Sequence, residues 1–379
     1  MSEVEEVIEG RGIYIHATWS REPEKGVAEV KEDIDLIAKS NFNFIAPYMR
    51  SGDRANYRKS SILPKLNYLE WDPLEVIVKE AHDKGLEVYP IICTLVDGGF
   101  KLGEILTRHP EWAMVTKDGR RIGWADPAKP EVVEYEVSIV REIVENYNVD
   151  GIILDYIRFP EREYGETCYC KYCRSKFEEE YGTDPIELKE REPLADKWDD
   201  WRRERVSLLV KRISEEVHKL GADLKLGAYF YAGVTNRYYV FQDWPAWIRR
   251  GYLDFSLPSG SFYEYASANM SLLRRSCLFH RRVTLDTIPS YVTIHVTSSG
   301  GVLKPGELLW AIKIARETGM QGVALFDWES LEPKTGIYSF IGYNPLLAEA
   351  RMAFAKKAKI PHRVTNYPKS LRESLRVQV

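Results

Sequence analysis

The stretch YNVDGIILDYIRFP, residues 147–160, gives the clearest indication of the fold. Its short apolar run, Ile152 to Leu154, lies between turn signals, a pattern typical of a strand buried on both faces. Asp155 follows at the carboxyl end of that strand. In a barrel of parallel strands this end carries the chemistry, so Asp155 is a candidate catalytic carboxylate. The alternative is a structural role, in which Asp155 caps the next loop and pairs with Arg158.

Strand-like runs and helical patterns alternate along the rest of the chain. Eight strands alternating with eight helices predict a (β/α)8 TIM barrel. A doubly wound open sheet is the alternative, but no glycine-rich phosphate loop follows the first strand. The predicted strands are 12–18, 43–48, 87–93, 151–157, 225–231, 255–260, 283–291 and 322–328, and the predicted helices are 27–40, 72–85, 130–147, 202–221, 244–251, 266–280, 305–319 and 344–358.

The length of 379 residues fits one barrel, because such barrels run from about 250 residues upward when they carry insertions. We assign residues 1–358 to a single catalytic barrel domain. Residues 359–379 are polar and basic and are predicted to form a tail, or an arm on a partner subunit of a homo-oligomer. Two connections, 93–130 and 159–201, are long and leave the carboxyl ends of strands three and four, which is typical of loops that shape a substrate site.

The net charge of −4 gives no electrostatic reason to expect a nucleic-acid or anionic membrane partner. The start, MSEVEEVIEG, is acidic and lacks the apolar core of a secretory signal. No apolar run approaches the roughly 18 residues that a membrane span needs. We therefore expect a cytoplasmic protein. Charged residues make up 29% of the chain, a proportion that favours a thermophilic source.

A series of short motifs occurs in order from Arg11 to about Asn344, namely Arg11-Gly12, Asn43, Asp72-Pro73-Leu74, Glu80-Ala81-His82, Gly85-Leu86, Val149-Asp150-Gly151, Asp155, Pro160, Trp201-Arg202-Arg203, Leu226-Gly227, Trp247, Gly251, Asp254 and Pro258. This series resembles the glycoside-hydrolase-like family 10 proteins, within the barrel superfamily of α-galactosidase and α-amylase type. The resemblance implies a barrel that acts on a carbohydrate, with Asp155 as the leading catalytic carboxylate and no organic cofactor.

The chain departs from the family pattern at two places. Many relatives carry two adjacent aspartates at the end of the fourth strand, and here the second is Tyr156. The sixth strand ends Pro258-Ser259-Gly260-Ser261, where relatives often have a glutamine after the proline. The substrate is therefore expected to differ from that of better-studied members.

Cleavage of a glycosidic bond needs an acid for the leaving oxygen and a second carboxylate as nucleophile or base. Asp155 therefore needs a partner on the same face of the barrel. The candidates are Glu264 after strand six, and Asp327 or Glu329 at the end of strand eight. Asp327 stands beside Trp328, whose indole could raise a carboxyl pKa by desolvation. The alternative is that Asp327 caps its loop and Glu264 is solvated.

Polar and aromatic residues at other strand ends are typical of a sugar site, because rings stack on sugar C–H surfaces and polar groups orient the hydroxyls. Ordinary barrel packing is the alternative for each of them. Arg158 could hold a carboxylated sugar or neutralise the nucleophile. Trp124 and Asp126, in the long third loop, are further candidates for the rim. The candidate substrate-binding residues are His16, Trp19, Tyr48, Arg50, Arg158, Tyr229, Tyr231 and Trp328.

The segment CYCKYC places three thiols, Cys168, Cys170 and Cys173, within six residues. This spacing suits a metal clip, because soft thiolates select zinc in a tetrahedral site. A disulfide or a cluster of reduced thiols is the alternative. The run CYCKYCRSKFEEEYG resembles a segment of family 42 β-galactosidases that can hold a structural zinc with one more cysteine from near the third strand. That resemblance implies Cys93 as the fourth ligand.

Two other functional classes stay open. A non-catalytic carbohydrate-binding barrel is favoured by Tyr156, which stands where relatives have the second aspartate. A zinc-dependent hydrolase would act at the cysteine cluster, but no histidine-rich metal motif lies on the barrel strands. No G-x-S-x-G pattern supports a serine nucleophile.

Overall fold

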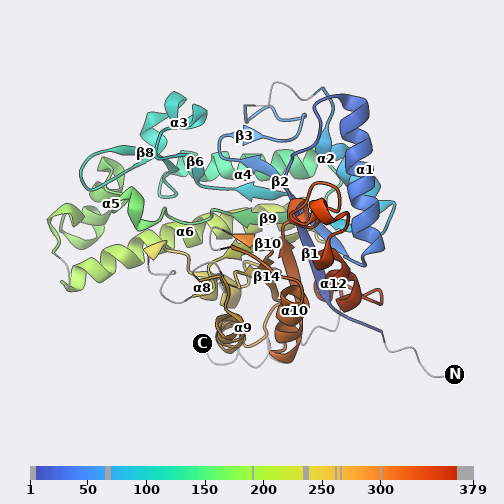
Figure 1. Cartoon of the computed structure of the whole chain (residues 1–379). Helices are drawn as coiled ribbons and strands as arrows, with labels where there is room; N and C mark the ends of the chain where they lie inside the picture. The colour runs from blue at the N-terminus through green and yellow to red at the C-terminus, as the bar shows by residue number, and fades with distance from the viewer. Residues whose placement is uncertain are drawn as a thin grey trace.

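The computed structural model describes residues 6–64, 70–189, 192–233, 239–260, 263–264, 267–298 and 301–364. Within this part of the chain, eight parallel strands form a nearly closed barrel surrounded by helices (Figure 1), which confirms the predicted (β/α)8 architecture. The last neighbours are joined by backbone hydrogen bonds from Ser256 to Pro289 and from Gly260 to Thr293, both 2.9 Å long. In order around the barrel the strands are β11 (Phe255–Pro258), β10 (Lys225–Phe230), β9 (Gly151–Asp155), β5 (Ile91–Cys93), β2 (Phe44–Ser51), β1 (Gly10–Ile15), β17 (Gly322–Phe326) and β14 (Tyr291–His295).

The helices of the outer layer follow the predicted patterns. Several begin with proline in the first turn, where the missing N–H has no intrahelical partner to lose. Each turns an apolar stripe toward the barrel; on the helix Pro130–Asn146 this stripe includes Val132, Val137 and Ile143. The helices are α1 (Pro23–Lys39), α2 (Pro73–His82), α4 (Pro130–Asn146), α6 (Pro193–Leu220), α8 (Trp244–Arg249), α9 (Met270–Thr284), α10 (Glu307–Glu317) and α12 (Pro345–Ala353).

The seventh strand is the one element that the sequence misplaced. The prediction was 283–291, whereas β14 starts at Tyr291 and pairs with β17 through His295. Residues 283–284 instead extend α9, whose buried face continues through Cys277, His280 and Thr284. The helix ends at Leu285, which takes a left-handed conformation with φ of 51°. The β-branched residues near 283 gave a strand signal, but the helical burial pattern outweighs it.

The two long connections lie at the carboxyl ends of β5 and β9, as predicted. The first folds into a small antiparallel sheet of β6 (Val96–Gly99), β8 (Arg121–Ala125) and β7 (Ala113–Val115), with α3 (Glu104–Arg108) beside it. The second carries α5 (Lys171–Tyr181) (Figure 1). Both connections rise over the same end of the barrel, where they can wall a site.

The opposite, amino-terminal end of the barrel is filled by rings. In β1, Gly12 has no side chain because a Cβ there would lie 2.2 Å from the Phe44 ring. His362, from the turn Pro361–Arg363, stacks on Phe255 with ring centroids 4.6 Å apart. Its two nitrogens lie 2.7 and 2.8 Å from the hydroxyls of Tyr89 and Tyr291. Residues 359–364 therefore close this end of the barrel.

Among the described residues, none of the helices combines the length and the apolar character that crossing a membrane would require.

Candidate active site

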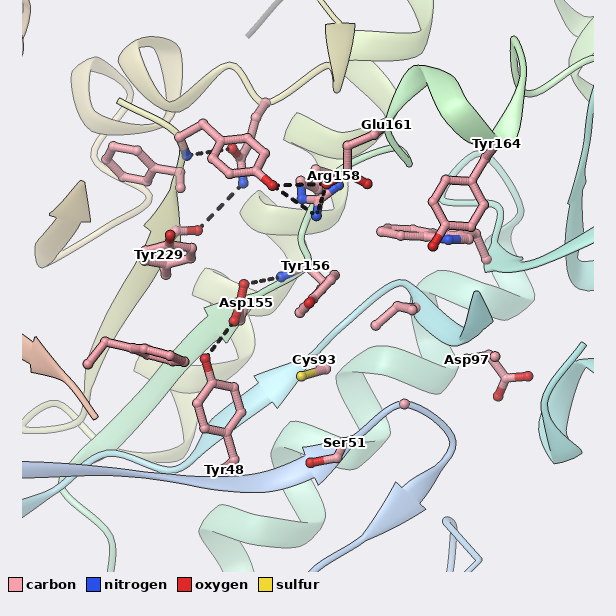
Figure 2. Close-up of a pocket in the computed structure, with 18 of the residues that line it drawn as sticks. Tyr48, Ser51, Cys93, Asp97, Asp155, Tyr156, Arg158, Glu161, Tyr164 and Tyr229 are labelled. Atoms are coloured by element: carbon pink, nitrogen blue, oxygen red, sulfur yellow. Dashed lines mark hydrogen bonds and ion pairs between the residues drawn. The ribbon is translucent and has the colours of Figure 1, made fainter. Parts of the chain in front are cut away.

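A pocket of about 700 Å³ opens at the carboxyl ends of the barrel strands. Figure 2 shows residues from β2, β5, β9 and β10, together with both long connections, around it. Among the described residues, the lining is rich in rings and carboxylates and includes a single arginine. Its polar and aromatic members include His16, Tyr48, Cys93, Asp97, Trp124, Asp155, Tyr156, Arg158, Glu161, Glu163, Tyr164, Tyr229, Tyr231, His295 and Phe326.

Asp155 ends β9 in this pocket and is only 6% exposed. The Tyr48 hydroxyl donates to Oδ2 at 2.9 Å, and the backbone N–H of Tyr156 donates to Oδ1 at 2.6 Å (Figure 2). The second bond forms because Tyr156 takes a left-handed conformation, with φ of 49°, a region that few non-glycine residues adopt. Burial raises the pKa of Asp155, while these two hydrogen bonds and the charge of Arg158 act in the opposite direction.

His16, just after β1, is held by carboxylates from the other end of the chain. Its ring stacks on Tyr48, with centroids 4.7 Å apart and planes 6° from parallel. Its Nδ1 lies 3.2 Å from Glu329 Oε2 and 3.5 Å from Asp327 Oδ2, and its backbone N–H donates to Glu329 Oε1 at 2.7 Å. Burial lowers the pKa of His16, but the hydrogen bond and charge of Glu329, with the charges of Asp327 and Asp155, more than offset it and leave this pKa raised.

Arg158 is committed to internal contacts. Its guanidinium lies over the rings of Trp124, Tyr156 and Tyr231, at 5.0 to 5.2 Å from their centroids. It also forms a 2.7 Å ion pair with Glu161, which accepts a further hydrogen bond of 2.9 Å from the Tyr231 hydroxyl. The arginine thus shapes the wall of the pocket, and its charge is neutralised there.

Tyr229 and His295 stand together on the β10 and β14 side, with the tyrosine hydroxyl 3.4 Å from His295 Nε2. Burial lowers the pKa of His295 to about 4. The sequence prediction missed this histidine because it ended the seventh strand at Tyr291. Proline at 289, which interrupts the predicted strand, was the available signal.

Other predicted residues do not line the pocket. Trp19 donates to Asp33 at 2.7 Å, and Trp328 is buried in α11 (Trp328–Leu331). Arg50 forms a fully buried ion pair with Glu136 of α4, because its side chain leaves β2 toward the helix layer. These three side chains are therefore not among the residues that line this pocket.

The two proposed partner carboxylates have different surroundings. Asp327 caps α11 by accepting a hydrogen bond of 3.0 Å from the Ser330 backbone, and its other oxygen faces His16. Glu264 belongs by its backbone to β12 (Tyr263–Glu264), which pairs with β13 (Ser267–Ala268). The side chain of Glu264 lies outside the described part of the chain.

A second cluster joins the two long connections. The Oδ2 of Asp126 lies 3.2, 3.2 and 3.0 Å from the sulfurs of Cys168, Cys170 and Cys173, and all four side chains are buried. Burial raises the pKa of Asp126 to about 7. Three thiols and a carboxylate converging on one point fit a tetrahedral metal ion such as zinc.

The fourth member of this cluster differs from the prediction. Cys93 ends β5 directly beside Asp155 and lines the pocket, apart from the three other thiols. Asp126, predicted for the rim of the sugar site, takes the fourth position instead. The sequence alone did not distinguish Cys93 from Asp126 as the fourth ligand, because Cys93 begins the long connection 93–130 and Asp126 lies near its end.

Known proteins resemble this chain over much of its length. Glycosyl hydrolase YngK of Bacillus subtilis is 25% identical over 64% of the chain and 51% of its own length. The glycoside hydrolase domain of PgaB from Bordetella bronchiseptica superposes with a TM-score of 0.67 at 14% identity, over 86% of this chain and 97% of that domain. The GH42 β-galactosidase Gan42B of G. stearothermophilus superposes with a TM-score of 0.64 at 14% identity, over 93% of this chain and 56% of that chain. The solved structures support the fold.

The chain spans about half the length of the curated relatives it matches. The family model described as glycosyl hydrolase-like 10 matches residues 10–278, which hold the first six barrel strands, Asp155 and the cysteine cluster. Since this match extends over more than half of the sequence, the chain belongs to the glycosyl hydrolase-like 10 family.

Proposed function

We propose that the protein hydrolyses a glycosidic bond of a carbohydrate in the barrel pocket, with Asp155 as the carboxylate that faces the anomeric carbon. The observation that carries this proposal is the setting of Asp155: it is buried at the end of β9, and both of its oxygens accept hydrogen bonds within a ring-lined pocket. A fixed negative charge in such surroundings stabilises an oxocarbenium-like transition state.

The second group of the pair is proposed on the side where β1 and β17 end. Asp327 and Glu329 lie there, in contact with His16. Glu264 in the β12–β13 hairpin is the alternative. The second group is therefore sought on the carboxyl-terminal face of the barrel, either as one of these three carboxylates or as a side chain that they hold.

A screen of nitrophenyl glycosides, with wild type and Asp155→Asn side by side, tests the proposal. The substitution keeps the shape of the side chain and removes its charge, so turnover should fall by about 10³-fold or more. Asp254→Asn is the matched control: this carboxylate lies at the other end of the barrel, 2.9 Å from His218. Near-normal turnover in Asp155→Asn, with melting temperature unchanged, would remove the assignment.

The competing function is a barrel that binds carbohydrate without cleaving it. Tyr156, which stands where relatives have a second aspartate, is the feature that favours it. Under this alternative, a column that carries a glycan would retain the wild-type protein, and the protein would release no reducing ends from that glycan. Asp155→Asn would give the same two results.

We also propose that the cluster of Asp126, Cys168, Cys170 and Cys173 holds a structural zinc ion. When bound, zinc would cross-link the two long connections. Four protein ligands leave no open coordination position, and none of these side chains lines the barrel pocket. For this reason a zinc-dependent hydrolase is the weaker alternative.

A further inference from the structure

One histidine of the pocket, His16, is held by two carboxylates that favour its protonated form. His16 is bound at Nδ1 and at its backbone N–H by the two oxygens of Glu329, and Asp327 approaches the same Nδ1. Because both carboxylates meet one nitrogen, Nε2 is the nitrogen left to meet a substrate. The side chain is 36% exposed and lines the pocket.

Neither carboxylate is placed to give up a proton directly. Both oxygens of Glu329 face His16, and neither Glu329 nor Asp327 is among the residues that line the pocket. Asp327 uses Oδ1 for the Ser330 backbone and hydroxyl, and its Oδ2 faces His16. Any proton shared in this group therefore reaches a substrate through the imidazole.

The ring is also close to the proposed centre of the reaction. His16 stacks on the Tyr48 ring, and the Tyr48 hydroxyl is the group that donates to Asp155. The edge of Phe326 covers another side of the imidazole, at 5.5 Å between centroids. A sugar oxygen bound above Asp155 would lie on the same wall of the pocket as His16.

We propose that His16 is the proton donor of the hydrolysis, held in its acidic form by Glu329 and Asp327. This inference rests on the proposed glycosidase function and names the group that completes it. The role of Asp327 becomes that of a positioning residue, together with Glu329, because both act through His16.

The electrostatics agree with this geometry. The charged and titratable groups that face His16 are Glu329, Asp327, Asp155 and the Tyr48 phenol. None of these four groups carries a positive charge. The pKa of His16 is raised, although burial alone would lower it. His295, across the pocket, has its pKa lowered to about 4 by burial and is neutral where His16 is charged. The two histidines are thereby distinguished.

The proposed step balances in protons and electrons. The glycosidic C1–O bond breaks with its electron pair left on the leaving oxygen, which takes the Nε2 proton of the imidazolium. In a retaining course Asp155 bonds to C1, and a water later displaces it while the neutral imidazole takes the proton of that water. In an inverting course water adds to C1 directly and Asp155 takes its proton. Either way one water is consumed.

Leaving-group dependence separates a proton donor from a structural residue. His16→Gln should lower turnover of an alkyl glycoside by about 10²-fold or more, whereas a dinitrophenyl glycoside, which needs no proton, should stay within about tenfold of wild type. Asp155→Asn should slow both substrates. Equal losses on both substrates in His16→Gln would overturn the inference. Activity of Asp155→Asn on both substrates would instead overturn the proposed function.

The pH profile provides a second readout. The protonated ring is the working form, so kcat/KM should fall as pH rises through the His16 pKa, above its usual 6.5. Glu329→Gln removes the contact that raises this pKa, and the fall should begin at lower pH. Glu111→Gln, which breaks an exposed pair with His109, should shift nothing.

Titration of isotope-labelled histidines by NMR needs no substrate. His16, assigned through the loss of its signal in His16→Gln, should titrate above 6.5 in wild type and lower in Glu329→Gln. A His16 pKa below 6.5 in wild type would overturn the inference whatever the glycoside screen shows.

Discussion

Asp155 receives its two hydrogen bonds from different strands, since Tyr48 belongs to β2 and the Tyr156 N–H directly follows β9. The carboxylate is therefore fixed by the barrel itself and not by a mobile partner. Its ionised form has to be maintained against burial, and the Tyr48 hydroxyl is one of the groups that lower its pKa. Removal of the Tyr48 hydroxyl tests this balance.

Tyr48→Phe removes that hydroxyl and keeps the ring on which His16 stacks. The pKa of Asp155 should rise further, by up to about one unit for one hydrogen bond. Since the proposed hydrolysis needs the ionised carboxylate, the acidic limb of kcat/KM should move to higher pH, and the loss should be largest at low pH. A pH–rate profile checks this, and an acidic limb that stays in place would contradict it.

At this scale the sequence predicts which residues end strands better than where their side chains point. His16, Tyr48, Arg158, Tyr229 and Tyr231 all reach the pocket. Trp19, Arg50 and Trp328 lie equally near strand ends but turn toward the helix layer. Trp19 is held by Asp33 on the next helix, α1, 14 residues along the chain, whereas Arg50 is held by Glu136 on α4, 86 residues away. No local pattern encodes the second pairing.

Among the elements, the connection after β9 contributes to both sites. Arg158 and Glu161 wall the pocket, and seven residues later Cys168 joins the cluster with Asp126 that is proposed to bind zinc. Asp126 closes the cluster from the other long connection. We therefore expect metal to fix the position of a pocket wall, in addition to stabilising the loops.

Elemental analysis of protein purified without added metal should give one zinc per chain. Cys170→Ser should reduce this content and lower the melting temperature, because bound metal contributes directly to folding free energy. Cys93→Ser is the matched control and should keep its zinc, since Cys93 lies in the barrel pocket. Loss of zinc in Cys93→Ser, or none in wild type, would refute the ligand set.

The cysteine spacing alone indicated a metal clip, and the long connections were visible as interruptions of the strand and helix alternation. The fourth ligand was not predictable. Choosing between Cys93 and Asp126 requires knowing that β5 ends inside the barrel and that β8 turns back toward α5, which is a matter of tertiary packing.

The whole molecule is a barrel open at one end and plugged at the other. The barrel architecture was predictable from the alternation of strands and helices along the chain, because each strand and helix buries complementary apolar faces. The plug was not predicted, because residues 359–364 were assigned to the segment 359–379, which is polar and basic as a whole and was expected to form a tail. The burial of His362 is tolerated because its two nitrogens face the hydroxyls of Tyr89 and Tyr291, and Glu87 lies 3.5 Å from its Nε2.

His362→Ala should therefore cost about 2–4 kcal/mol of unfolding free energy, from lost ring packing and the loss of its hydrogen bonds to the Tyr89 and Tyr291 hydroxyls. His109→Ala, at an exposed histidine, should change stability by no more than about 0.5 kcal/mol. Urea unfolding of the two variants measures both values. Equal stability of the two would show that the plug is dispensable.

One consequence follows from the contact between Ile8 and Lys359, which form a parallel bridge at the amino-terminal end of the barrel. Both ends of the described chain leave the molecule on the side away from Asp155. The protein, immobilised on a bead or joined to a binding module through the region of Ile8 and Lys359, would present the open mouth of its barrel outward. Under the proposed function, a long glycan could then enter from solution without meeting the support, whereas attachment through the segment around Glu161 would obstruct it.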